Sequence, residues 1–119
     1  MLEGSWAVSQ VRVSYPVLGK KQVTEKLRLA RSRLEKKLPV SKMILYGSYA
    51  TGRYTAGSDV DVLVVYSGEQ REDAYRLVID EVALPRLEPK VYSEEQFNAL
   101  IARSRKFIEI LERESIVIS

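Results

Sequence analysis

Residues 58–66 read Ser58-Asp59-Val60-Asp61-Val62-Leu63-Val64-Val65-Tyr66. From Val60 onward almost every residue is β-branched, aliphatic or aromatic, which is the composition of a β-strand. This is the strongest strand signal in the chain, and we expect the strand at the centre of a sheet. Because side chains alternate along a strand, Val60, Val62 and Val64 should enter a core, whereas Asp59 and Asp61 should share the opposite face.

The two aspartates place two negative charges close together. Two carboxylates held this close are costly unless something neutralises them, and a divalent cation is the usual remedy. With oxygen ligands alone, magnesium or manganese is the expected ion. The alternative is that Asp59 caps a loop and Asp61 lies on a solvent-exposed strand face.

A second feature precedes this strand, in the stretch Ile44-Leu45-Tyr46-Gly47-Ser48-Tyr49-Ala50-Thr51-Gly52. An expected strand at 42–46 delivers a glycine and a serine to a helix start. Glycine lets a backbone amide approach an anion closely, and helix N-termini favour phosphate. Taken alone, a Gly-Ser pair also fits a plain turn or a helix cap.

Gly47-Ser48, ten intervening residues and then Asp59-Val60-Asp61 form a more specific pattern than either part alone. The pattern resembles the signature of the DNA polymerase β nucleotidyltransferase superfamily, in particular its minimal single-domain members (minimal nucleotidyltransferases). Gly52 and Ser58 extend the resemblance, which is close over residues 43–65. It implies an α/β (α+β) nucleotidyltransferase fold, with a small mixed sheet flanked by helices.

The resemblance also implies roles for individual residues. Gly47 and Ser48 would contact the phosphates of a nucleoside triphosphate, and Asp59 and Asp61 would bind Mg²⁺ or Mn²⁺. The family's third metal-binding carboxylate lies on a neighbouring strand, and Glu88 is the candidate for it. These three carboxylates would be the catalytic residues.

Two of these assignments have open alternatives. Glu88 precedes Pro89, which favours the extended conformation of a strand, although family members usually lack a proline there, and Glu88 is otherwise a surface glutamate. Arg53, between the two motifs, is a candidate contact for the triphosphate or a partner; otherwise it is a solvated loop arginine.

The remaining periodicities predict the other elements. An amphipathic basic helix should cover about 23–38 and end before Pro39; its cations are a candidate nucleic-acid face, although a solvated helix face has the same composition. Capping-box patterns at Ser67 and Ser93 predict helices to about residue 82 and residue 111, with an edge strand at 86–92 between them. Residues 116–118 would form a last short strand. Residues 1–22 form an N-terminal arm of open structure (edge strand, partner-contacting arm or partly disordered), and 23–119 a single nucleotidyltransferase domain.

Composition limits the chemistry further. The 119 residues carry 19 basic and 16 acidic side chains, with no cysteine and no histidine. Disulfides, thiol nucleophiles and histidine-based catalysis are therefore excluded. No apolar run is long enough to cross a membrane and no signal-peptide core is present, so we expect no membrane contact and a cytoplasmic location.

The resemblance implies an enzyme that moves a nucleoside monophosphate, AMP from ATP, onto a hydroxyl of a partner protein. Minimal members are often paired with a helical HEPN-type ribonuclease toxin, for which they act as antitoxins. A catalytically inactive module that neutralises the same partner by binding is the first alternative. A transferase acting on a small molecule or an RNA end is the second. The sequence leaves self-association open.

Overall fold

The computed structural model describes residues 18–119. The expectation for the first 17 residues lies outside the described part, and the division at residue 22 remains a prediction. In chain order the elements are α1 (Lys20–Leu34), β2 (Val40–Tyr46), α2 (Ser48–Thr51), β3 (Val60–Tyr66), α3 (Ala74–Val82), β4 (Leu87–Ser93), α4 (Glu94–Arg103), α5 (Arg105–Arg113) and β5 (Ser115–Val117).

The four described strands form one mixed sheet in the order β4-β3-β2-β5. β3 has the bounds and the central position that its composition predicts. It pairs antiparallel with β2 and parallel with β4, and β2 pairs antiparallel with β5. β4 lies at one edge of the sheet, as its prolines predict.

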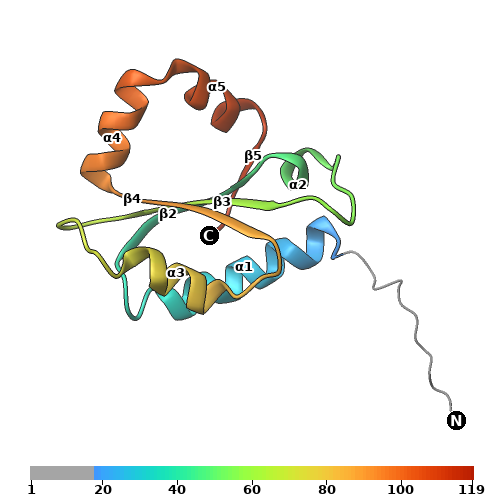
Figure 1. The fold of residues 1–119 in the computed structure, drawn as a ribbon, viewed down its shortest axis with the longest axis horizontal. Coiled ribbons are helices and arrows are strands. Elements are labelled where there is room, and N and C mark those ends of the chain that lie inside the picture. Colours follow the sequence, from blue (N-terminus) through green and yellow to red (C-terminus); the bar gives the residue numbers. More distant parts are fainter. Residues whose placement is uncertain (1–17) are drawn as a thin grey trace, which may run out of the picture.

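Helices cover both faces of this sheet (Figure 1). α1 and α3 pack on one face against Val60, Val62 and Val64, the side chains predicted to enter a core. α4 and α5 lie over the other face, where Leu63 and Val65 pack with residues of both helices. The alternation along β3 therefore places Asp61 on the same face as α4 and α5.

The first helix differs from its prediction at both ends. It begins at Lys20, where the Gly19 N–H donates to Gln22 Oε1 at 2.7 Å. It ends at Leu34, although Leu38 is still buried. After Leu34 the Lys36 and Lys37 N–H groups bond the carbonyls three residues earlier, those of Arg33 and Leu34, so the last turn tightens and leaves the α-helix before Pro39.

Two other helix predictions were wrong in their bounds. The Ser67 pattern does not start a helix, because the Ser67 N–H and hydroxyl both bond the Pro39 carbonyl and Gly68 has a φ of 91°. α3 begins only at Ala74. The Ser93 capping box is present, but the predicted single last helix is two helices, because Ser104 is non-helical and its Oγ caps the Phe107 N–H.

In residues 18–119 no helix combines the length and apolar character needed to cross a bilayer.

Candidate functional site

Gly47 joins β2 to α2 in a conformation that few other residues adopt. Its φ is 77° and its ψ is −152°, a region populated almost entirely by glycine. A Cβ at this position would overlap Asp61 Oδ2 and lie 3.3 Å from Asp61 Cγ. The backbone and the carboxylate therefore meet at a point that only glycine leaves open.

Asp61 and Glu88 lie side by side on the paired strands β3 and β4. In the β3–β4 register Asp61 lies directly opposite Glu88, and in the β2–β3 register it lies opposite Tyr46. Register partners project from the same face of a sheet, so these three side chains lie together on the α4 and α5 face. The expectation that Glu88 lies on a strand neighbouring the aspartates is confirmed by its place in β4.

Negative charge accumulates around Asp61 on this face of the sheet. Burial, followed by the charges of Asp59 and Glu88, raises the pKa of Asp61 above its ordinary value, while Lys90 lowers it. Burial and the charge of Asp61 raise the pKa of Tyr46 to about 12. Within the described residues, neither Asp61 nor Glu88 forms an ion pair. The site would thus gain from a bound cation.

Asp59 is placed differently from the other two carboxylates. It lies one residue before β3, and its Oδ1 is 3.5 Å from the Arg86 guanidinium. Both side chains of this ion pair are about half exposed, at 51% and 54%. Asp59 is therefore close enough to influence Asp61, yet it is directed toward a cation of the chain itself.

The donor set fits a magnesium or manganese ion in its chemistry. All three donors are carboxylates, and Asp61 and Glu88 lie opposite each other on paired strands. In geometry the fit is partial, since no three acidic side chains of residues 18–119 are grouped closely enough to hold a metal ion. The structure brings two of the predicted ligands together and leaves Asp59 with Arg86.

The two remaining predicted site residues flank this arrangement. Ser48 is the first residue of α2, directly after Gly47, as the sequence predicts. Arg53 follows α2; its Nη2 lies 3.6 Å from Glu114 Oε2, and its side chain is 74% exposed. Its Nε also donates to Thr51 Oγ1 at 3.4 Å. The predicted contact of Arg53 with phosphate remains a prediction.

Three residues of the site were missed at the level of sequence. Two of them, Tyr46 and Lys90, project from the same face of the sheet as predicted site residues. Tyr46 lies opposite Asp61, and Lys90 lies two residues beyond Glu88 on β4. A search at i±2 along each expected strand would have found Lys90. The same search would have found Arg86, which lies two residues before Glu88 in the expected strand 86–92, although its contact with Asp59 depends on how β4 aligns with β3.

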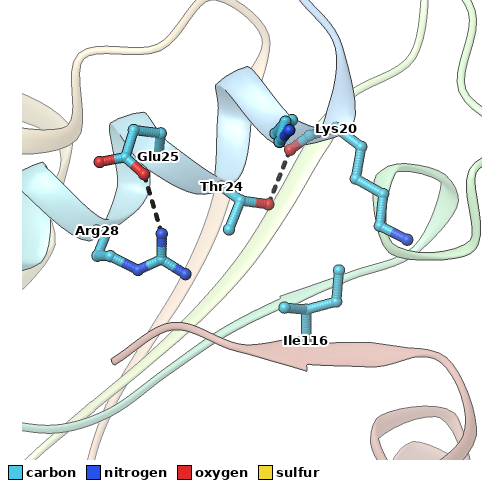
Figure 2. Close-up of a pocket in the computed structure, with 6 residues that line it drawn as sticks. Lys20, Thr24, Glu25, Arg28 and Ile116 are labelled. Carbon is cyan, nitrogen blue, oxygen red and sulfur yellow. Dashed lines mark hydrogen bonds and ion pairs between the residues drawn. The ribbon is translucent and has the colours of Figure 1, made fainter.

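A separate hollow of about 510 Å³ lies between α1 and β5. Figure 2 shows Lys20, Thr24 and Arg28 of α1 across from Ile116 of β5. Ile116 packs with the α1 and α3 core, on the face of the sheet opposite Asp61. This hollow is therefore distinct from the carboxylate site.

The mixed sheet thus brings Gly47 against Asp61, which lies opposite Glu88. Residues 26–117 match the model of the nucleotidyltransferase domain family, and the chain belongs to that family. This confirms the predicted fold class.

A solved structure supports the fold independently. The crystal structure of a candidate nucleotidyltransferase from Sulfolobus solfataricus superposes with a TM-score of 0.55 at 13% sequence identity. The alignment covers 82% of this chain and 80% of that protein. At this identity the likeness supports the fold alone. No curated protein matches this chain.

The charge on Asp61 gives a first prediction, for stability without metal. Because the pKa of Asp61 is raised in the folded state, the protonated carboxyl favours folding, and that advantage is lost as the pH rises through the folded pKa. Asp61→Asn does not titrate. We expect its midpoint of thermal unfolding at pH 7 to exceed that of wild type by roughly a few degrees, measured by circular dichroism in EDTA.

The same comparison near pH 3 should show a smaller difference, since the wild-type carboxyl is then protonated. Asp80→Asn, at an exposed position of α3, is the matched control and should leave the midpoint unchanged. If the stability that Asp61→Asn gains over wild type is no larger at pH 7 than at pH 3, the raised pKa assigned to Asp61 is contradicted.

Proposed function

We propose that this nucleotidyltransferase domain moves a nucleoside monophosphate, AMP from ATP, onto a hydroxyl of a partner protein, with Mg²⁺ or Mn²⁺ bound. The observation that carries the proposal is the register of Asp61 opposite Glu88, beside the glycine turn. It supplies two carboxylates for metal next to a backbone turn that suits phosphate. The base, the metal and the acceptor rest on the resemblance to minimal nucleotidyltransferases.

Each residue has a distinct role in this reaction. Asp61 and Glu88 would hold the metal, joined by Asp59, and Gly47 and Ser48 would contact the triphosphate through backbone and hydroxyl groups. A metal held there would supply charge neutralisation for the phosphates and for the attacking and leaving oxygens. Arg53, which is exposed and cationic, would approach the departing pyrophosphate.

The transfer balances without a further reactant. The acceptor oxygen forms a bond to the α-phosphorus as the bond from that phosphorus to the bridging oxygen of pyrophosphate breaks. The acceptor hydroxyl loses its proton, and Glu88, a carboxylate on this face, is the candidate to receive it. Pyrophosphate leaves with the electron pair of the broken bond.

The proposed partner is a HEPN-type helical protein, and the test uses it directly. Incubated with this chain, magnesium and ATP labelled at the α-phosphate, the partner should become labelled. ATP labelled at the γ-phosphate should leave it unlabelled, because the label departs with pyrophosphate. Label from γ-phosphate alone would instead indicate phosphorylation and would contradict the proposal.

One observation favours the binding-module alternative. The three carboxylates do not form a metal-binding group in residues 18–119, because Asp59 faces Arg86. A module that neutralises its partner by binding alone needs no such group. If an Asp59→Asn/Asp61→Asn double variant inhibits the partner as well as wild type does, this alternative is supported.

The hollow between α1 and β5 favours the other alternative, transfer to an RNA end. Its lining includes Lys20, Lys21 and Arg28, cations that suit a phosphate backbone. In that case label from α-labelled ATP should appear on RNA and on no protein. Lys20→Glu/Lys21→Glu should then reduce RNA labelling.

A further inference from the structure

Arg86 occupies an unusual position at the start of β4. Its φ of 61° places a non-glycine residue in the left-handed region, a strained conformation that persists where the surroundings enforce it. Its carbonyl accepts the Val60 N–H at 2.8 Å, a bond that fastens the chain before β4 to the first residue of β3. The backbone of Arg86 is therefore fixed directly beside Asp59.

The side chain of Arg86 is held much less firmly than its backbone. The guanidinium lies 3.5 Å from Asp59 Oδ1, and both side chains are about half exposed. Exposed ion pairs are weak and easily exchanged for other partners. The pair can therefore open without disturbing the strand pairing that fixes the backbone.

This contact distinguishes Asp59 from the other two carboxylates of the site. Asp61 and Glu88 have no ion-pair partner in the described part of the chain, whereas Asp59 does. The ion pair directs Asp59 to a cation of the chain, and the three carboxylates of residues 18–119 form no metal-holding group. Arg86 thus occupies the carboxylate that the proposed metal needs.

We propose that Arg86 is a positioning residue that competes with the divalent cation for Asp59. When the metal binds, Asp59 exchanges Arg86 for the metal and joins Asp61 and Glu88. Arg86 therefore weakens binding of metal in the absence of nucleotide. This inference rests on the proposed function, because it assumes a metal at these carboxylates.

The test measures the affinity of the full chain for Mn²⁺ without nucleotide, from the electron paramagnetic resonance signal of free Mn²⁺. Arg86→Gln should bind Mn²⁺ about two- to five-fold more tightly than wild type, the size expected for loss of an exposed ion pair. Arg86→Lys, which keeps the charge, should stay near wild type. Arg86→Gly removes the guanidinium and tolerates a positive φ, so it tests the same point if Arg86→Gln folds poorly.

Arg33→Gln is the matched control, because Arg33 of α1 is as exposed as Arg86, at 54%, and also lies 3.5 Å from a carboxylate, that of Glu81, away from the site. It should leave the Mn²⁺ affinity unchanged. Equal tightening by Arg33→Gln and Arg86→Gln would mean that only net charge matters and would overturn the inference. Unchanged or weaker binding in both Arg86→Gln and Arg86→Gly would overturn it too.

Asp61→Asn separates failure of this inference from failure of the proposed function. If Asp61→Asn abolishes Mn²⁺ binding while the Arg86 variants match wild type, the metal site stands and the role of Arg86 is wrong. If neither wild type nor any Arg86 variant binds Mn²⁺, the metal site and the inference both fail.

Discussion

Asp61→Asn is expected to reduce nucleotidyl transfer on the order of 10³-fold, with the protein still folded. Asp61 lies at the centre of the carboxylate face, opposite Glu88 and against Gly47. Loss of a metal ligand removes several kcal/mol of charge stabilisation in the transition state, and each 1.36 kcal/mol is tenfold in rate. The measurement is release of pyrophosphate from ATP in the presence of magnesium and the acceptor.

Stability serves as the internal check on this result. Because Asp61→Asn is expected to be more stable than wild type at neutral pH without metal, lost activity cannot be ascribed to unfolding. Asp80→Asn, at an exposed position of α3, should retain full activity. Activity within tenfold of wild type in Asp61→Asn would exclude this carboxylate from the chemistry.

Gly47→Ala is expected to damage both the fold and the site. Alanine would be forced into a backbone region that is nearly exclusive to glycine, and its Cβ would overlap the Asp61 carboxylate. We expect the free energy of unfolding to fall by about 1–3 kcal/mol, the cost of such strain. We also expect loss of Mn²⁺ binding, because Asp61 must move. Urea unfolding and Mn²⁺ titration measure the two effects.

Two other glycines distinguish the effect of backbone strain from the effect of steric overlap with Asp61. Gly52 also has a positive φ, 84°, but a Cβ there meets nothing within 4 Å. Gly52→Ala should therefore lose stability through strain and keep Mn²⁺ binding. Gly57→Ala, with neither a positive φ nor a neighbour within 4 Å, should be close to neutral in both measurements. Equal Mn²⁺ binding by Gly47→Ala and Gly52→Ala would argue against a close approach of Gly47 to the functional carboxylate.

Where one local interaction dominates, the sequence predicted the structure well. The apolar run from Val60 defined β3 and its central place, since no other stretch competes with it. The Ser93 capping box marked the start of α4 because Ser93 and Gln96 satisfy each other's backbone amides. The glycine-serine turn and the strand position of Glu88 followed from similarly local preferences.

The errors arose where tertiary contacts overrode local patterns. The Ser67 pattern resembled a helix start, yet its donors bond Pro39, a residue distant in sequence. The apolar spacing continued through Ser104, and periodicity alone could not reveal that this serine breaks the helix. The Arg86–Asp59 ion pair depends on the register of two strands, which a pattern in either strand cannot specify.

The most direct test of the central claim locates the metal and nucleotide on the protein. In a ¹⁵N-labelled sample, Mn²⁺ with ATP broadens the amide resonances nearest the bound ion. The account predicts that the amides of Gly47, Ser48, Asp61 and Glu88 broaden first, while those of Lys20 and Thr24 at the separate hollow persist. Broadening centred on that hollow, or none at the carboxylate face, would contradict the account.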